Sequence, residues 1–351
     1  MKKKMALCTP IPDKKLDIIK EYCDVTICGE LKHGKGNVTE EMTREECMGN
    51  ELVVLGDEYA GADTITAWAN AGMKFLGVAK GTPATVDYDA IADAGLELSY
   101  TPGRNRVAVA EFCIGMMIAS TRRLALSSTG LQKGEHLGAP VDDVYNIPDV
   151  KNVTWGPLDA NHPFTDYGIG FELYGKTLGI AGYGAIGREV AVRAMAFGMD
   201  VIAYDPYCPV EKIEADGAKA VDLDTMLSQS DIISIHLPVL PSTKAMVNKD
   251  WFSKMKKTAY VINTARAAVI DQKDFVEALQ NGTIAGAAVD VFWQEPIPAN
   301  HPLLSMRNVT LTPHMAGLTT DVDGWSGNMM GDEVIAYLKG EPRKYLWKLK
   351  K

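Results

Sequence analysis

Three charged side chains in the second half of the chain could together act on a small organic acid. Arg266 carries a planar guanidinium whose paired N–H donors can bind a carboxylate and a neighbouring carbonyl oxygen together. An imidazole titrates near neutrality, so His314 could give a proton to a developing alkoxide or take one from an alcohol. Glu295, 19 residues before His314, could orient the imidazole and favour its charged form. Reduction of a 2-oxo acid needs these groups and, in addition, a source of hydride.

The stretch 177–205 has the features of a dinucleotide site, which would supply that hydride. It opens with the apolar run 178–181, typical of a buried parallel strand, and a helix is expected over 185–197. A tight turn, close approach of the backbone to a pyrophosphate and close packing of helix on strand each need a glycine. The helix N-terminus also offers unpaired N–H groups to phosphates. The glycines stand in the spacing G-x-G-x-x-G, at Gly182, Gly184 and Gly187.

Asp205 indicates which dinucleotide is bound. It lies 18 residues after the last glycine, at the end of a second apolar run. A carboxylate there can accept hydrogen bonds from the ribose hydroxyls of NAD, whereas a 2′-phosphate would be repelled. The glycine spacing alone is a weak signal, but strand, helix and acid together predict NAD binding rather than NADP binding.

Four further short apolar runs in the second half of the chain each end close to a charged or titratable residue. The runs are 232–237, 259–263, 285–291 and 309–311. In a doubly wound parallel sheet, residues at the carboxyl ends of strands converge on one crevice. We therefore expect the following residues near the cofactor: His236, Arg266, Asp290, Glu295 and His314.

The first hundred residues read as short strands alternating with helices, which is typical of another parallel α/β sheet. Lys80 and Gly81 follow the end of one such strand, where open α/β sheets place their ligands. Lys80 could supply charge and Gly81 a backbone N–H to an anion. A surface lysine beside a turn glycine would have the same sequence, and both readings stay open.

Two segments connect these sheets. The residues 107–126 predict one long apolar helix, either deeply buried or at a subunit interface. The residues 127–175 are rich in Pro, Asp, Asn and Gly, which indicates a long loop or arm. His136 and His162 lie in this arm, where we expect them to face solvent.

Composition limits the classes of function. A chain of 351 residues predicts two domains, and its net charge of −9 argues against a nucleic-acid surface. The six cysteines show no C-x-x-C or zinc spacing, so we expect free thiols in a reducing cytosol and no metal site. No run of 18 apolar residues could span a membrane, and no signal-peptide core follows the basic start. We expect a cytoplasmic protein without membrane or nucleic-acid partners.

Four ordered motifs resemble those of the D-isomer-specific 2-hydroxyacid dehydrogenase family: GYGAIG with Asp205, NTARAAVID, DVFWQEP and TPHMAG. The resemblance covers nearly the whole chain and is strongest to phosphoglycerate dehydrogenases and hydroxypyruvate or glyoxylate reductases. It implies two Rossmann-like, doubly wound parallel-sheet α/β domains, with the cofactor domain inserted into a discontinuous substrate domain. The substrate domain would comprise 1–106 and 318–351, and the NAD-binding domain 107–317. The helix at 107–126 and the arm would help to form a homodimer.

The resemblance also implies roles for single residues. Arg266, Glu295 and His314 would be catalytic in NAD-dependent interconversion of a D-2-hydroxy acid and its 2-oxo acid. Asp290 would bind the nicotinamide amide, and Thr264 would offer its carbonyl there. The full set predicted to bind the cofactor is Gly182, Gly184, Ala185, Ile186, Gly187, Asp205, His236, Pro238, Thr264, Asp290 and Gly317.

Two departures from the family pattern bear on the site. Ala267 stands where the family usually has glycine, which is tolerated if its φ is negative. A loop containing Lys80 replaces the usual glycine-rich substrate loop. We hypothesise that Lys80, with Arg104 and Asn105 as candidate partners, binds the substrate carboxylate or a second anionic group. The residues predicted to bind substrate are Lys80, Gly81, Asn105, Arg266 and His314.

Two alternatives remain beside the dehydrogenase. A non-catalytic, NAD-sensing regulatory protein, as the family's transcriptional corepressors suggest, could keep the same motifs. A formate dehydrogenase would call for glutamine opposite the histidine, where this chain has Glu295. The sequence does not separate glycerate, lactate or a sugar acid as the substrate.

Overall fold

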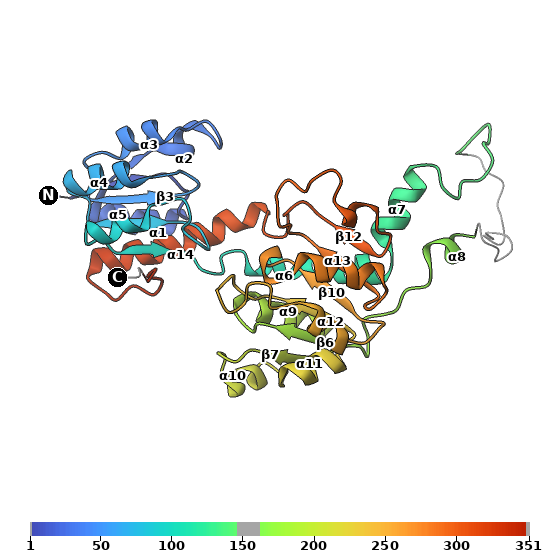
Figure 1. The fold of residues 1–351 in the computed structure, drawn as a ribbon. Helices are drawn as coiled ribbons and strands as arrows, with labels where there is room; N and C mark the ends of the chain where they lie inside the picture. Colours follow the sequence, from blue (N-terminus) through green and yellow to red (C-terminus); the bar gives the residue numbers. More distant parts are fainter. Residues whose placement is uncertain (1, 146–161, 349–351) are drawn as a thin grey trace. The chain divides into compact units, whose positions relative to one another are not determined.

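Two parallel β-sheets organise the chain, each in its own part of it (Figure 1). The structure is a computed structural model that describes residues 2–145 and 162–348. Unit 1 comprises Met1–Arg106 and Gly317–Lys351, and unit 2 comprises Val107–Ala316. The prediction of two doubly wound parallel-sheet α/β domains is confirmed.

Unit 1 is built on a five-stranded sheet of order β2-β1-β3-β4-β5. Every neighbouring pair is parallel, and the short apolar strands β3 and β4 are buried on both faces. Because the chain order reverses between β1 and β3, the switch point of this sheet lies there. The strands are β1 (Lys3–Leu7), β2 (Cys23–Ile27), β3 (Leu52–Leu55), β4 (Phe75–Val78) and β5 (Leu98–Tyr100).

Helices from both ends of the chain cover the sheet of unit 1. In Figure 1 the red helix α14 lies beside elements of the N-terminal segment, and it packs on α1. Met330 and Val334 of α14 share one apolar core with Met5, Leu7 and Phe75. The helices are α1 (Asp13–Tyr22), α2 (Gly29–His33), α3 (Glu40–Cys47), α4 (Ala62–Asn70), α5 (Tyr88–Asp93) and α14 (Thr320–Lys339).

Unit 2 contains a seven-stranded parallel sheet of order β12-β11-β10-β9-β6-β7-β8. Its chain order reverses between β6 and β9, and two apolar cores cover the sheet. The strands are β6 (Thr177–Ala181), β7 (Asp200–Tyr204), β8 (Lys219–Ala220), β9 (Ile232–Ile235), β10 (Tyr260–Asn263), β11 (Gly286–Val289) and β12 (Val309–Leu311). The helices are α6 (Arg106–Thr121), α7 (Leu124–Gln132), α8 (Pro163–Tyr167), α9 (Ala185–Ala196), α10 (Val210–Ala215), α11 (Leu223–Gln229), α12 (Lys249–Lys254) and α13 (Gln272–Gln280), with 3-10 turns η1 (Ala267–Val269) and η2 (Pro302–Ser305).

The connection between the sheets differs from the prediction in two respects. The helix predicted over 107–126 is two helices, α6 and α7, because Arg123 adopts a left-handed conformation with φ 57°. One face of α6 packs into a core of unit 2, which agrees with the deep-burial reading of this segment. The predicted arm is helical up to Gln132, and its residues 146–161 lie outside the described residues.

The expectation that both arm histidines face solvent is wrong for His162 and is met only in part by His136, whose side chain is 14% exposed. The side chain of His162 is buried, and its Nδ1 accepts a hydrogen bond from the Phe164 N–H at the start of α8. All six cysteines are free, as predicted. Within residues 2–145 and 162–348, no helix is both long and apolar enough to cross a membrane.

Candidate active site

His314 and Glu295 form a hydrogen-bonded pair in unit 2. His314 Nδ1 lies 2.7 Å from Glu295 Oε2, so Nε2 is the ring nitrogen that can exchange a proton with a substrate. The second oxygen of Glu295 accepts from the Phe292 N–H at 2.9 Å. Burial alone would raise the pKa of Glu295, but these hydrogen bonds and the charges of His314 and Arg266 outweigh burial and lower it. Glu295 is therefore an ionised partner for the imidazole at neutral pH.

The loop that carries His314 is held by the carboxylate of Asp290, which is fully buried. Asp290 Oδ1 accepts from Thr312 Oγ1 at 2.6 Å and from the Met315 N–H at 2.8 Å, and Oδ2 accepts from the Ala316 N–H at 2.8 Å. Within this loop His314 adopts φ 56°, a conformation that costs energy outside glycine and is concentrated at functional sites. Asp290 thus positions His314 in this structure, while its binding of a nicotinamide amide stays a prediction.

Arg266 follows β10 and is exposed. Its Nη1 donates to the Ala265 carbonyl at 2.7 Å, and its charge contributes to the lowered pKa of Glu295, so the three candidate catalytic residues lie together. Asn263 fixes this loop: its Oδ1 accepts from the Ala265 N–H, and its Nδ2 donates to the Arg266 carbonyl. The sequence analysis missed Asn263, although a polar residue ending an apolar strand was a usable signal. Ala267 does not have a positive φ, so its backbone conformation tolerates alanine in place of glycine.

The three glycines after β6 have the geometry that a pyrophosphate site needs. Gly182 has φ +94°, and a Cβ there would lie 2.8 Å from the His236 carbonyl oxygen. A Cβ on Gly187 would lie 2.3 Å from the Gly182 carbonyl oxygen, so only glycine lets α9 approach the strand. Gly184 caps α9 and has open space where a side chain would stand. This cradle, with Ala185 and Ile186 as the first residues of α9, fits the phosphates of NAD.

Asp205 follows β7 and accepts three backbone hydrogen bonds. Its Oδ2 accepts from the Tyr183 N–H at 2.8 Å, and its Oδ1 from the N–H groups of Tyr207 and Cys208 at 2.9 and 3.2 Å. The carboxylate is thereby fixed next to the glycine turn. This is where the adenine ribose of NAD would bind.

The remaining residues predicted to contact the cofactor lie at strand ends of unit 2, apart from Gly317. His236 pairs with Ser234 Oγ at 2.8 Å, and burial lowers its pKa to about 4, so it is neutral at pH 7. Thr264 is buried directly after β10, and the Pro238 carbonyl accepts from Thr243 Oγ1. Gly317 begins the second segment of unit 1.

In unit 1 Lys80 lies in the wall of a cavity of about 190 Å³. Burial is the main cause that lowers its pKa, and the charges of Arg104 and Lys35 lower it further. Lys80 is ion-paired with Asp57, a residue that the sequence analysis did not consider. Asn105 does not line this cavity; its amide lies 2.7 Å from where a Cβ of Gly317 would stand. Lys80 and Arg104 are thus brought together, and Asn105 is not.

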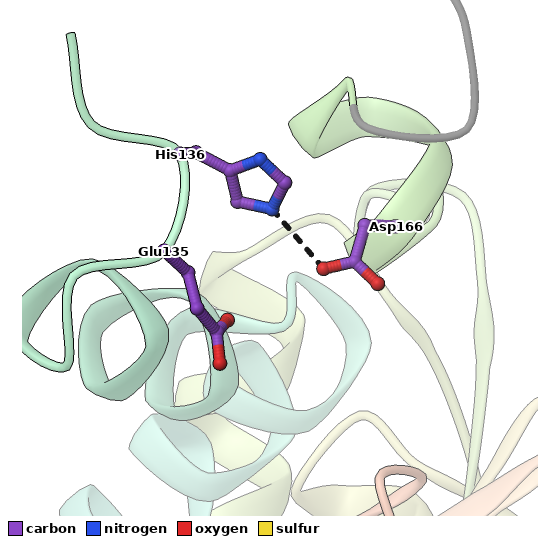
Figure 2. Close-up of side chains that lie close together, drawn as sticks. All are labelled: Glu135, His136 and Asp166. Carbon is purple, nitrogen blue, oxygen red and sulfur yellow. Dashed lines mark hydrogen bonds and ion pairs between the residues drawn. The ribbon is translucent and has the colours of Figure 1, made fainter. Parts of the chain in front are cut away.

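Glu135, His136 and Asp166 of the arm also lie close together, with one possible metal-ligand atom each within 4.8 Å of the others (Figure 2). His136 Nε2 bonds Asp166 at 3.1 Å, Arg307 bonds the other oxygen of Asp166 at 3.0 Å, and Tyr167 donates to Glu135 at 2.9 Å. These contacts tie the two described ends of the arm to each other. The expectation of no metal site stays a prediction.

Comparison with known proteins gives consistent matches. A family model described as "D-isomer specific 2-hydroxyacid dehydrogenase, NAD binding domain" matches residues 114–316. The chain is 35% identical over 333 residues to a glyoxylate reductase of Thermofilum pendens, covering 94% of this chain and 90% of that protein. It is 31% identical to a D-3-phosphoglycerate dehydrogenase of Methanocaldococcus jannaschii, covering 96% of this chain but 58% of that protein.

The fold of the chain also resembles that of solved structures. The apo-structure of D-lactate dehydrogenase from Escherichia coli superposes with a TM-score of 0.69 at 25% identity. That match covers 98% of this chain and 100% of the other. The similarity therefore extends over both units.

Proposed function

Because the chain belongs to the D-isomer-specific 2-hydroxyacid dehydrogenase family, we propose that it interconverts a D-2-hydroxy acid and its 2-oxo acid. The predicted family, the fold class and NAD as cofactor are confirmed. The relatives support an NAD-dependent oxidoreductase acting on 2-hydroxy acids. The 2.7 Å contact between His314 and Glu295, within reach of the charge of Arg266, carries the assignment of the catalytic residues.

Each residue of this trio has one task in reduction of the oxo acid. Bound NADH supplies the hydride. Arg266 binds the carboxylate and polarises the carbonyl oxygen with its paired donors. His314, charged and held by Glu295, gives a proton from Nε2 to the oxygen as negative charge develops there. In oxidation of the hydroxy acid, neutral His314 takes that proton back.

The test is NADH oxidation, followed by absorbance, against a panel of 2-oxo acids with NADPH run in parallel. We expect turnover with NADH and a clear preference over NADPH, because Asp205 would repel the 2′-phosphate. His314→Asn should lower kcat by about 10²- to 10⁴-fold while NADH binding is retained. Turnover at the parent rate in this variant would exclude His314 as the acid. NADH binding without turnover of any acid would favour the NAD-sensing regulatory protein instead.

We further propose a cytoplasmic homodimer formed through α7 and the arm. The support is a set of exposed apolar side chains on these segments: Leu124, Leu131, Leu137, Val141, Val144 and Ile169. Light scattering on the protein as it elutes from a size-exclusion column should give twice the mass of the chain. Leu131→Glu should shift the measured mass toward that of the monomer. A parent protein that elutes as a monomer at micromolar concentration would refute the dimer. The six free thiols are consistent with a reducing compartment.

A further inference from the structure

Three buried thiols lie in one apolar core of unit 1. Cys8 directly follows β1, Cys28 directly follows β2, and Cys47 ends α3. The strands β1 and β2 are parallel neighbours, so their carboxyl ends bring Cys8 and Cys28 to the same edge of the sheet. Buried thiols often pack simply as small apolar side chains. Two features, a direct contact between sulfur atoms and access from a cavity, set Cys8 and Cys47 apart from such packing.

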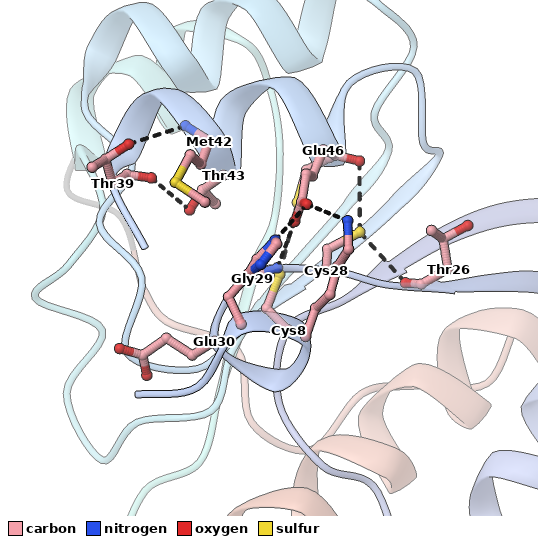
Figure 3. A network of polar contacts seen from close by, with 12 residues as sticks. Cys8, Thr26, Cys28, Gly29, Glu30, Thr39, Met42, Thr43 and Glu46 are labelled. Carbon is pink, nitrogen blue, oxygen red and sulfur yellow. Dashed lines mark hydrogen bonds and ion pairs between the residues drawn. The ribbon is translucent and has the colours of Figure 1, made fainter. Parts of the chain in front are cut away.

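The first feature is the contact between Cys8 and Cys47, whose sulfur atoms lie 3.7 Å apart. A disulfide needs about 2.05 Å between its sulfurs, so the two thiols must approach further but already face each other. Cys28 also interacts with Cys47. Its Sγ, however, donates to the carbonyl oxygens of Thr26 and Glu46 at 3.6 Å each, as Figure 3 shows. Cys8 is therefore the better placed partner for Cys47.

The second feature is that a small oxidant can reach Cys8. Its side chain belongs to the wall of the cavity of about 190 Å³ described above. That volume is several times the roughly 30 Å³ that a water molecule occupies in the liquid. Lys35 and Asp57 of the same wall are exposed to solvent, so the cavity opens to the outside. A hydroperoxide can therefore meet the Cys8 sulfur first, since Cys47 is 0% exposed.

We propose that Cys8 and Cys47 form a reversible disulfide when a hydroperoxide enters this cavity. With hydrogen peroxide, the Cys8 sulfur attacks one oxygen, the S–O bond forms, the O–O bond breaks, and water leaves with the thiol proton. The Cys47 sulfur then attacks the Cys8 sulfenic acid, the S–S bond forms, the S–O bond breaks, and a second water leaves. The two thiols lose two electrons in all, and the peroxide gains them. A thiol reductant reverses the reaction by exchange.

The pair stays reduced while peroxide is scarce. Contact with Cys47 lowers the pKa of Cys8, but burial and the neighbouring carboxylates of Glu58 and Glu46 raise it by more. Because the thiolate rather than the thiol is the nucleophile, Cys8 reacts slowly at neutral pH. Cys47 beside it then captures the sulfenic acid before further oxidation.

The disulfide would fasten α3 to the end of β1, and the local structure favours this bond. Glu46 Oε2 of α3 accepts from the Gly29 N–H at 2.9 Å, and Asn50 Nδ2 donates to the Cys47 carbonyl at 3.1 Å. These contacts hold the end of α3 in place before oxidation. A cross-link between residues 39 positions apart restricts the unfolded chain, so oxidation should stabilise unit 1. None of these steps depends on the proposed function.

The experiment treats the reduced full chain with hydrogen peroxide and then removes the excess with catalase. Alkylation in denaturant counts the remaining thiols, and mass spectrometry of a non-reduced digest identifies linked peptides. We expect two of the six thiols to disappear, a cross-link between Cys8 and Cys47, and recovery of all six thiols with dithiothreitol. The oxidised chain should unfold at a temperature about 5–10 °C higher.

Variants test the order of the two steps. Cys47→Ala should leave a sulfenic acid on Cys8 that dimedone labels, and Cys8→Ala should leave Cys47 as a thiol. Cys23→Ala, the matched control, removes a thiol from a different core of unit 1 and should form the same cross-link as the parent.

The parent chain alone can overturn the inference, whether or not the variants fold. A digest without the link between Cys8 and Cys47 would refute it. A link between Cys28 and Cys47, or oxidation confined to the half-buried Cys208, would refute it as well. A cross-linked chain that unfolds at a lower temperature than the reduced chain would overturn the stabilising role of the bond.

Discussion

At the scale of single residues, the contact between His314 and Glu295 decides in which direction pH changes the rate. Glu295 keeps its charge at neutral pH because its pKa is lowered, so it stabilises the protonated imidazole. Glu295→Gln removes that charge but can keep a hydrogen bond. We expect reduction of the oxo acid to fall roughly tenfold at pH 8, and the pH profile of reduction to move to lower pH. Oxidation of the hydroxy acid, which needs neutral His314, should lose less.

Initial rates in both directions from pH 5 to 9 measure this effect, and NADH binding is the control. Profiles that coincide for the parent and Glu295→Gln would show that Glu295 does not set the protonation of His314. The carboxylate would then only orient the ring.

The contacts of Glu46 lead to a prediction about the stability of the fold rather than about catalysis. Burial opposes its ionisation, but hydrogen bonds from Lys32, His33 and the Gly29 N–H outweigh burial and lower its pKa from 4.5 to about 2. A lowered carboxyl pKa stabilises the folded state fully above pH 4.5, and this contribution is lost as pH falls toward 2. Glu46→Gln should therefore cost about 1–2 kcal/mol at pH 7, after allowance for solvent screening, and much less at pH 3.

Urea unfolding at pH 7 and at pH 3 measures this difference. Glu45→Gln, an exposed acid on the same helix, should show no such dependence. An equal loss of stability at both pH values would mean that the charge of Glu46 contributes nothing.

The sequence predicted which residues belong to the candidate sites better than it predicted the side chains that those residues contact. Arg266, Glu295 and His314 could be chosen because each lies near the end of an apolar run, and strand ends of one parallel sheet meet. Lys80 was chosen in the same way, but Asp57 and Asp323 beside its cavity were not. Those acids are brought there by strand order and by a helix from the far end of the chain, which no local pattern encodes.

At the scale of elements, the turn between β6 and α9 depends on a glycine that no other residue can replace. A Cβ on Gly187 would lie 2.3 Å from the Gly182 carbonyl oxygen, a backbone atom that cannot move aside alone. Gly187→Ala should cost about 3 kcal/mol or more and abolish NADH binding. Gly115→Ala in α6 should instead stabilise by about 0.5–1 kcal/mol, since a Cβ there meets no atom within 4 Å.

Chemical denaturation and NADH titration of the two variants test this pair. Full NADH affinity in Gly187→Ala would show that α9 can shift without loss of the phosphate cradle. Equal destabilisation by both alanines would show that the close contact at Gly187 does not cause the loss of stability in Gly187→Ala.

Strands were easier to predict than helix boundaries. The run 309–311 coincides with β12, and the runs 178–181 and 259–263 each begin within one residue of β6 and β10 and end with them, because short apolar runs between turns have few other solutions. The sequence did not predict the break between α6 and α7. Arg123 adopts a left-handed conformation there, and a glycine at this position would have indicated the break. His162 was misjudged because its burial depends on distant packing rather than on the polar sequence around it.

At the scale of the whole molecule, the two units differ in how the chain builds them. Unit 2 is one continuous segment with its own two apolar cores, so residues 107–316 alone should fold and bind NADH. Unit 1 takes α14 from the second segment, and Met330 and Val334 complete its core. Residues 1–106 alone should therefore show no cooperative thermal unfolding.

Unit 1 can be restored as a single fragment by joining its two segments. A Cβ of Gly317 would lie 2.7 Å from the Asn105 amide, so residue 106 and residue 317 can be joined by a short Gly-Ser linker. The joined fragment should unfold cooperatively in circular dichroism and should not bind NADH, whereas 107–316 should bind NADH within about tenfold of the full chain's affinity. Cooperative unfolding of 1–106 without α14 would show that the second segment is dispensable for the core. Failure of 107–316 to bind NADH would show that NADH binding needs unit 1.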